Sequence, residues 1–309
     1  MNGYGLFLTI YVGLVLSVFG QGSLTPPGPP APTMKSLAQI EPRIPISSLP
    51  FTISASGSYY FTGNLQFSAA TGHAITISAS DTTLDLMGFT LSSTAGVTGN
   101  AIHVNSGLRN IAVQNGALEG NTSVTITTAG LNQTWTVTPA GFNLGINAIT
   151  STNCQFSHLR ISGCRTTALN GGDGAAIDHV TTSSNGSAGI NASNGSVTNS
   201  TALSNGGTGI LASTGSVTNS TANSNGGAGI SANAGSVTSS TASLNGSSGI
   251  SAISGTVTNS TANTNGNDGI LATTGVVAFC KAVGNNLNNN GSLDIDAVGA
   301  TRTGNNPTP

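Results

Sequence analysis

The chain has 309 residues, of which 43 are glycine, while charged and aromatic residues each make up 5%. This composition excludes an ordinary core built on Leu, Phe and Trp. The net charge of -2, without clustered Lys and Arg, excludes a nucleic-acid partner. Disordered chains usually carry more charge and fewer β-branched residues, whereas Val, Ile and Thr are frequent here. The composition favours short strands separated by tight Gly, Asn and Ser turns.

The N-terminal segment has the features of an export signal. Its apolar run, Leu6 to Phe19, is 14 residues long. That is shorter than the ~20 residues that span a bilayer, and it suits a signal peptide over residues 1–20. An uncleaved anchor is the alternative, because no Lys or Arg precedes the run. We therefore expect a protein that is secreted or at the cell surface, without a membrane span once the signal is removed. Residues 21–41 form a Pro-rich linker and entry segment.

Five blocks of 20 residues align without a gap between Asn185 and Gly284. Their consensus is N-G-x-x-G-I-x-A-x-x-G-S-V-T-N-S-T-A-x-x. A repeat of this period marks a solenoid. Three short stretches with period 2 in each block predict an all-β, right-handed parallel β-helix with coils of ~20 residues. The columns that begin at Ile190, Ala192 and Val197 are expected to face the core.

The register extends upstream with small insertions, so the β-helix is expected over residues 42–284. Residues 285–309 are then the last coil, a C-terminal cap and a tail. We expect the asparagines of one column to form a side-chain amide ladder at a turn. This column reads Asn115, His158, His179, Asn199, Asn219, Ser239, Asn259 and Phe279.

Three stretches of the chain carry a resemblance to known proteins: Pro42–Leu65, Ala74–Leu91 and Asn110–Gly120. With these residues and the Asn-Gly-x-x-Gly-Ile pattern, the chain resembles exported bacterial proteins that have a right-handed β-helix of the pectin-lyase-like type. It departs from them at Met87, where the relatives tend to carry Asn. The resemblance implies the fold and hardly any activity, because this fold hosts lyases, hydrolases, adhesins and binders.

Residues 121–141 do not follow the coil pattern. Apolar residues alternate from Val124 to Val137 around a Gly-Leu-Asn turn, which predicts an inserted β-hairpin that protrudes as a flap. Trp135, the one Trp of the sequence, is the candidate for stacking against a sugar. Insertions on a regular scaffold are frequent places of function.

His158 and His179 are the main candidates for chemistry. They stack one coil apart, so their Cα atoms are expected ~4.8 Å apart, with Asp178 and Arg160 beside them. Such a group could bind a metal or act as acid and base. The simpler interpretation is structural, because both histidines occupy the turn column. No second carboxylate stacks on Asp178, so neither a full calcium site nor a glycosidase pair is visible there.

The remaining acidic residues and the cysteines give few indications of a functional site. Asp294 and Asp296 share one strand face near the end of the β-helix and are the remaining candidates for calcium ligands. No cofactor is predicted. The three cysteines, at positions 154, 164 and 280, are expected to be buried free thiols.

Rows of hydroxyl groups are predicted on the outside of the repeat. If Val197 faces the core, Ser196 and Thr198 face outward, and Thr218 and Thr258 continue the row in later coils. Such rows could bind a repetitive glycan, or an ice or crystalline surface. The simpler interpretation is that Ser and Thr cover an exposed strand face of low charge.

Taken together, these features predict a monomeric protein with a binding or structural role and a polysaccharide or cell-surface glycan as its partner. The alternative is a polysaccharide lyase or glycoside hydrolase that acts beside His158 and His179. Ice or crystalline-surface binding is the third hypothesis.

Overall fold

The structure is a computed structural model that describes residues 41–129, 132–288 and 290–304. The predicted signal peptide and most of the linker lie outside the described residues, as do the last five residues of the tail. None of the described segments is a helix with the length and hydropathy needed to cross a membrane.

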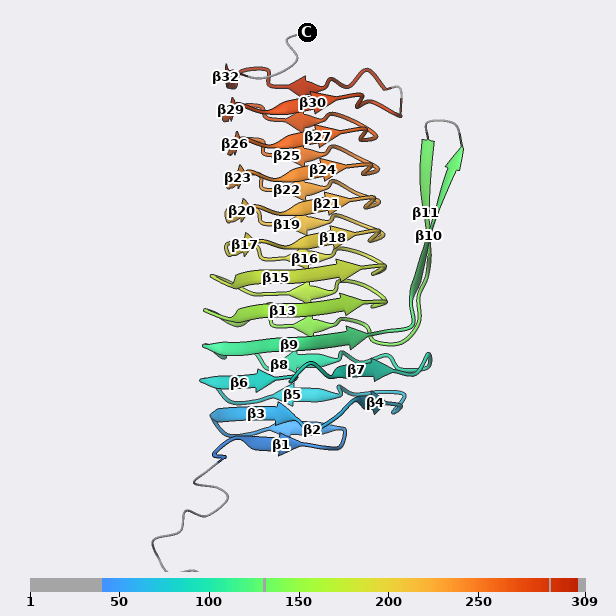
Figure 1. Cartoon of the computed structure of the whole chain (residues 1–309), viewed down its shortest axis with the longest axis vertical. Coiled ribbons are helices and arrows are strands. Elements are labelled where there is room, and N and C mark those ends of the chain that lie inside the picture. The colour runs from blue at the N-terminus through green and yellow to red at the C-terminus, as the bar shows by residue number, and fades with distance from the viewer. Residues whose placement is uncertain (1–40, 130–131, 289, 305–309) are drawn as a thin grey trace, which may run out of the picture. The chain divides into compact units, whose positions relative to one another are not determined.

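From Arg43 to Gly304 the described residues form a parallel β-solenoid with one inserted hairpin (Figure 1). Each strand pairs with its equivalent one coil along: Ile190 lies beside Ile210, and Val197 beside Val217, both 20 residues later. The predicted all-β, right-handed parallel β-helix with 20-residue coils is therefore confirmed. The earlier coils vary in length: Ile44 pairs with Tyr59, and Thr83 pairs with Ala112.

The larger sheet has 19 strands and forms two faces of each coil. Its strands are β1 (Ile44–Ile46), β3 (Gly57–Phe61), β4 (Leu65–Phe67), β6 (Thr82–Asp85), β7 (Thr90–Ser93), β9 (Ile111–Glu119), β13 (Gln155–Ser162), β15 (Ala176–Ser183), β17 (Ser196–Thr198), β18 (Thr201–Leu203), β20 (Ser216–Thr218), β21 (Thr221–Asn223), β23 (Ser236–Thr238), β24 (Thr241–Ser243), β26 (Thr256–Thr258), β27 (Thr261–Asn263), β29 (Val276–Ala278), β30 (Lys281–Val283) and β32 (Thr301–Thr303).

The second sheet has 11 strands and closes each coil, and a separate two-stranded sheet forms a hairpin. The second sheet contains β2 (Phe51–Ile53), β5 (Ile75–Ile77), β8 (Ile102–Val104), β12 (Ile146–Asn147), β14 (Leu169–Asn170), β16 (Ile190–Asn191), β19 (Ile210–Leu211), β22 (Ile230–Ser231), β25 (Ile250–Ser251), β28 (Ile270–Leu271) and β31 (Ile295–Asp296). The hairpin contains the antiparallel strands β10 (Ser123–Ala129) and β11 (Asn132–Thr138).

From Met87 to Phe279 the larger sheet bends at one residue in each coil, and these residues have φ between 49° and 58°. We call them the bend column. Asn tolerates this left-handed conformation better than most residues that carry a Cβ, which explains why Asn recurs here. Met87, the departure from the resembling proteins, belongs to the same column. The bend column consists of Met87, Asn115, His158, His179, Asn199, Asn219, Ser239, Asn259 and Phe279.

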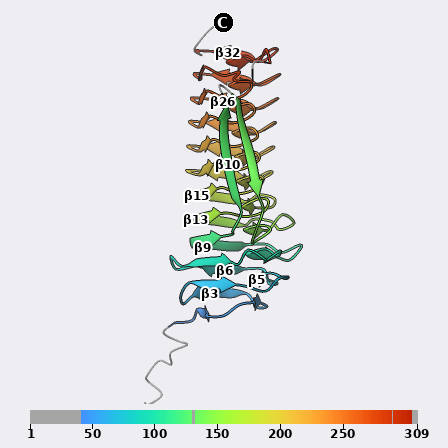
Figure 2. The ribbon, with the colours of Figure 1, turned by 90° about the vertical axis from the view of Figure 1, so that its right-hand side faces the viewer.

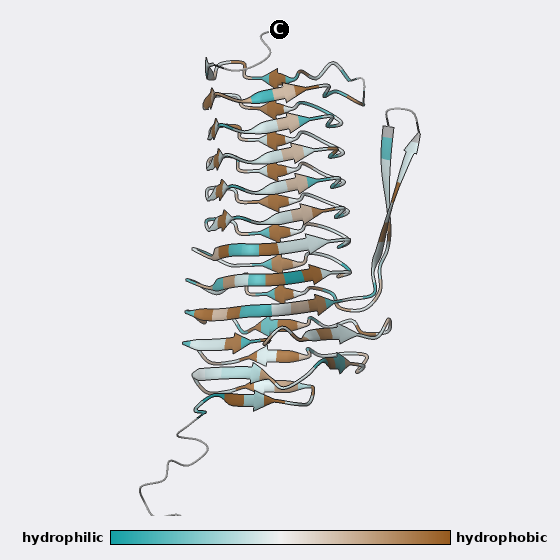
Figure 3. Ribbon diagram, viewed as in Figure 1, coloured by the Kyte–Doolittle hydropathy of each residue, from teal (hydrophilic) through white to brown (hydrophobic). Residues whose placement is uncertain are grey.

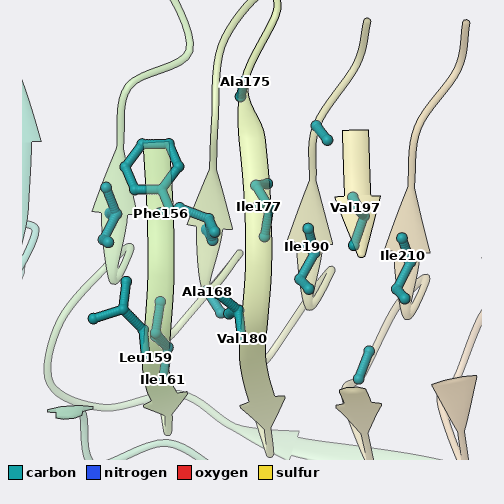
Figure 4. Packing of buried hydrophobic residues seen from close by; sticks show 14 of the residues in the cluster. Phe156, Leu159, Ile161, Ala168, Ala175, Ile177, Val180, Ile190, Val197 and Ile210 are labelled. Atoms are coloured by element: carbon teal, nitrogen blue, oxygen red, sulfur yellow. The ribbon is translucent and has the colours of Figure 1, made fainter. Parts of the chain in front are cut away.

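The core changes character along the solenoid. In the regular coils, Ile, Val and Ala columns such as those of Ile190 and Val197 are fully buried, as predicted. Apolar residues recur at one place on successive strands (Figure 3), and their side chains stack between neighbouring coils (Figure 4). In the earlier coils, Phe61, Phe142 and Phe156 are among the largest fully buried side chains. The expectation that no core is built on large residues is therefore wrong for this half, where the few aromatics are concentrated.

The amide ladder exists, but in a different column from the predicted one. It is formed by the buried asparagines of the Asn-Gly pairs, from Asn185 to Asn265 in steps of 20 residues, and continues to the half-buried Asn285. Asn205 Nδ2, for example, donates to Asn225 Oδ1 at 2.9 Å, and the backbone N–H of Asn205 donates to the same oxygen. The bend-column asparagines do not hydrogen-bond to one another among the described residues, because the left-handed bend directs them outward.

The three cysteines are buried and free, as predicted. Burial raises the pKa of the Cys164 thiol to about 12. These thiols therefore act as small apolar side chains and not as nucleophiles.

Candidate functional site

The regular coils present two rows of hydroxyl groups on one outer face, which we call the hydroxyl face. In each coil a Ser or Thr stands on either side of a buried valine, and the rows pair in register from coil to coil. Neighbouring hydroxyls are spaced ~4.8 Å between coils and ~7 Å along a strand. The hydroxyl face consists of Ser196, Thr198, Ser216, Thr218, Ser236, Thr238, Thr256 and Thr258.

A shallow, widely open groove of about 590 Å³ runs along one edge of the hydroxyl face. We call it the edge groove. Its lining includes Ser196, Ser216, Ser236 and Thr256, whose hydroxyls make no hydrogen bond to the described part of the protein. Glycines also contribute to its lining: a Cβ at Gly215 would collide with the carbonyl oxygen of Gly195, one coil earlier. These glycines therefore let neighbouring coils stack closely, and the unpaired hydroxyls beside them can meet a ligand.

A second cavity of about 310 Å³ continues the same edge toward the N-terminus. Thr83, Asn110, Asn153 and Gln155 contribute to its lining. Strand register connects the two cavities coil by coil along one line. That line contains Thr83, Ala112, Gln155, Ala176, Ser196, Ser216, Ser236 and Thr256.

Asp178 stands in register with the Thr198 row of the hydroxyl face. Its Oδ1 accepts hydrogen bonds from Thr198 Oγ1 at 2.7 Å and from Asn199 Nδ2 at 2.9 Å, and its Oδ2 lies 2.7 Å from His179 Nδ1. These hydrogen bonds, that of His179 first, lower the pKa of the Asp178 carboxyl to about 2. The group is therefore a charged acceptor at neutral pH.

The rings of His158 and His179 stack as the sequence suggested. Their centroids are 5.0 Å apart and their planes differ by 2°. Both residues belong to the bend column, so the left-handed backbone turns the imidazoles outward. His179 Nδ1 faces the Asp178 carboxylate, which leaves Nε2 on the other side of the ring to meet a ligand. The arrangement is that of an oriented base.

Arg160 is not joined to this cluster. It lies exposed on β13 beyond the bend, paired with Ala117 and Thr181, and no hydrogen bond or ion pair links it to Asp178 or either histidine in the described residues. Nor do the described residues contain a group of three His, Cys, Asp or Glu placed to hold a metal.

Asp294 and Asp296, the other metal candidates, have separate positions. Asp294 Oδ1 accepts hydrogen bonds from the backbone N–H and Nδ2 of Asn285, at 3.0 and 2.8 Å. It therefore terminates the amide ladder. Asp296 ends β31, and its backbone carbonyl accepts from Ala272.

The hairpin lies along the side of the coils (Figure 2). Trp135 Nε1 donates to the carbonyl oxygen of Ser224 at 2.8 Å. A Cβ added to Gly226 would lie 3.1 Å from Trp135 Cγ, and one added to Gly246 would lie 2.7 Å from its Cζ3. The segment predicted to protrude is thus packed on the Asn-Gly turns, and the indole N–H is already used. Sugar stacking by Trp135 stays a prediction.

A second pair of stacked histidines was not recognised from the sequence. The rings of His73 and His103 have centroids 4.2 Å apart, and the backbone N–H of Asn100 donates to His73 Nδ1 at 3.1 Å. Burial lowers the pKa of both rings, and for His73 the neighbouring His103 lowers it further. Both therefore favour the neutral form. The alignment of Ile75 with Ile102, which pair in the second sheet, is the sequence signal that could have revealed them.

Comparison with protein-family models gives no match, and neither does comparison with curated proteins. Among solved structures, the A-module of the Azotobacter vinelandii mannuronan C-5 epimerase AlgE6 is similar, with a TM-score of 0.58, 16% identity, and coverage of 75% of this chain and 69% of that one. The catalytic domain of a GH87 α-1,3-glucanase in complex with tetrasaccharides has a TM-score of 0.50, 13% identity, and coverage of 86% and 63%. ORF18 of Geobacillus virus E2 has a TM-score of 0.51, 11% identity, and coverage of 84% and 54%. The chain spans less than two thirds of the last two, and at these identities the likeness shows the fold.

Proposed function

We propose that the protein binds a polysaccharide along the hydroxyl face and the edge groove. The observation that carries this proposal is the row of Ser196, Ser216, Ser236 and Thr256, whose hydroxyls have no partner in the described protein and which line an open groove parallel to the solenoid axis. Hydroxyls are both donors and acceptors, as are the hydroxyls of a sugar. Because the row repeats at each coil, it suits a ligand that also repeats.

The comparisons add support by analogy of fold alone. One similar structure is a mannuronan epimerase module and another is a glucanase domain in complex with tetrasaccharides. Both are named for a polysaccharide on which they act. A carbohydrate is therefore the first ligand to test here.

The proposed setting is outside the cell. The apolar run from Leu6 to Phe19 supports export. The proposal includes a bacterial source and a monomer that is secreted or at the cell surface. Mass spectrometry of the protein recovered from the medium of an expressing culture would give its N-terminus, which we expect at residue 21.

Filling the groove tests the binding proposal. In the double variant Ser216→Tyr/Ser236→Tyr two rings replace hydroxyls of the groove lining, and we expect at least about tenfold weaker binding in a polysaccharide panel. The matched control, Thr221→Tyr/Thr241→Tyr, changes outward residues of β21 and β24 and should bind as the wild type does. Equal binding by both variants, or no binding by the wild type to any polysaccharide, would contradict the proposal.

Catalysis at His179 is the second candidate, favoured by its 2.7 Å contact with the charged Asp178 and by the stacked His158. In a lyase or hydrolase, His179 Nε2 would act as a general base or acid. Wild type and His179→Ala should be compared on the same polysaccharide panel by the release of reducing ends. Product formation that is unchanged in the variant would remove this candidate.

The hydroxyl rows are also the surface through which ice or another crystalline surface would be bound, the third hypothesis. Thermal hysteresis of the purified protein measures this directly. Its absence at high protein concentration would remove the idea.

A further inference from the structure

We infer that the polysaccharide held in the edge groove is uncharged and not a polyuronate or another acidic polymer. This inference rests on the proposed function and specifies its ligand class. It follows from two observations: the groove lining carries no charge, and the charged side chains next to the lining are mainly negative. An acidic chain needs positive charge at both places.

The lining of both cavities contains no charged side chain. It consists of hydroxyls, backbone at the glycines, a few alanines, Ile111, and the amides of Asn110, Asn153, Gln155 and Asn194. An acidic polymer brings one carboxylate with each unit, and a protein normally meets such groups with Arg, Lys or a bound cation. Neither Arg nor Lys is part of this lining. An acidic chain would therefore lose hydration of its carboxylates without a compensating charge from the protein.

The charges nearest the groove are mainly negative. Asp81 accepts a hydrogen bond from Nδ2 of Asn110 at 2.7 Å, and Asp173 accepts one from Nδ2 of Asn194 at 2.7 Å. Both carboxylates are exposed and are held by amides of the groove lining. Arg109 precedes Asn110 and lies in a ladder with Thr152 and Asp173. The described rim therefore sets two carboxylates against one guanidinium, which disfavours a polyanion.

The length of the groove indicates a polymer and not a single sugar. Its lining crosses five coils, from Ala175 to Thr256. Four steps of ~4.8 Å give ~19 Å along the axis, and the second cavity lies further along the same line of register. Each hydroxyl contributes little by itself, and the hydrogen bonds add up only for a ligand that follows the whole line. An uncharged linear glycan meets these conditions of length and charge.

The experiment compares neutral and acidic polysaccharides with the purified full chain at low and high ionic strength. The probes are a neutral β-glucan, a neutral mannan, an alginate and a polygalacturonate. We expect wild type to prefer a neutral polymer by at least about tenfold, with little dependence on salt. The double variant Ser216→Lys/Ser236→Lys should gain alginate or polygalacturonate binding at low salt, and that gain should disappear at high salt. The matched control, Thr221→Lys/Thr241→Lys, places the same charges away from the groove and should not gain it.

The outcomes separate the ligand class from the proposed function. Preference of the wild type for an acidic polymer would overturn the inference while leaving carbohydrate binding intact. The same holds if the groove lysines and the control lysines have equal effects on acidic polymers, because the lining charge would then not decide the class. If none of the four probes nor any member of a wider glycan panel binds, the proposed function fails and this inference with it. Circular dichroism of each variant shows whether the β-helix is retained.

Discussion

In the coils up to residue 184, the interior is filled by large side chains such as Phe61, Phe142 and Phe156, whereas the regular coils from Asn185 onward are filled by Ile, Val, Ala and the amide ladder. A large side chain packs against whichever neighbours it meets, so successive coils can differ in length and sequence. A ladder asparagine needs another amide at the same place in the next coil. The amide ladder therefore requires the same residue at the same position in every regular coil. The irregular coils carry no such requirement on length or sequence.

This difference explains where the chemical groups lie. Asp178 and the stacked His158 and His179 all belong to the irregular coils, as does the origin of the hairpin between β9 and β13. The regular coils supply the repeated surface, with the hydroxyl face and most of the edge groove. A repeating ligand would thus be held by one region and approached by the chemical groups of the other.

The largest expected effect is in the irregular core. Phe156→Ala removes a fully buried ring and should lower the free energy of unfolding by about 3–5 kcal/mol. In the regular core, Val217→Ala removes less and should cost about 2 kcal/mol. Denaturant unfolding, together with hydrogen exchange of amides in the flanking coils, measures both. Equal losses for the two variants would contradict the contrast between the cores.

The next effect is in the ladder. Asn225→Ala leaves both donors of Asn205 and the Ala202 carbonyl without their partner, and Asn245 Oδ1 keeps only the backbone N–H of residue 225. The expected cost is about 2–4 kcal/mol. The control is Asn219→Gly in the bend column, which should change stability by less than about 1 kcal/mol. Similar unfolding midpoints for the two variants would show that the buried amides do not hold the regular coils.

A smaller effect is expected where the hairpin from the irregular part meets the regular turns. Trp135→Phe keeps a ring against Gly226 and Gly246 but loses the hydrogen bond to Ser224, which costs about 1 kcal/mol. Faster hydrogen exchange confined to β10 and β11 is the expected result. Thr136→Val, on the opposite face of β11, serves as the control and should leave exchange unchanged. Exchange that rises throughout the regular coils would instead indicate that the hairpin supports the solenoid as a whole.

The smallest effect concerns pH. The Asp178 carboxyl has an ordinary pKa of 3.8 and a folded pKa of about 2, so the unfolded chain binds the proton first as pH falls. The stabilisation by Asp178 is complete above pH 3.8 and is lost between pH 3.8 and about 2. The difference in stability between wild type and Asp178→Asn should shrink over this window. A difference that stays constant would mean that the charge of Asp178 does not stabilise the fold.

The regular coils could be predicted closely because their repeat aligns identical residues, and the columns of Ile190 and Val197 follow from that alignment. The position of the ladder could not, because two asparagines recur in each block. Asn199 takes a left-handed φ and points outward, whereas Asn205 is fully buried. Only the backbone conformation distinguishes them.

The candidate site could be predicted in part for the same reason. His158, His179 and Asp178 follow from the register, which places them in adjacent coils. Arg160 follows the bend, and the change of direction there takes it to another face of the coil. For Trp135, alternation along the strand predicted a hairpin but not the side on which it would lie. The groove is lined by glycines and hydroxyl residues from successive coils, and its position depends on how those coils stack.

Each regular coil offers the same surface to the coil before it and to the coil after it, as the collision of a Cβ at Gly215 with Gly195 illustrates. A duplication or deletion of one 20-residue unit in the gene would therefore produce no mismatched junction. Each such event would lengthen or shorten the groove by one coil, ~4.8 Å, without altering its lining. Copy number, more readily than point substitution, would then set how long a polymer the protein can hold.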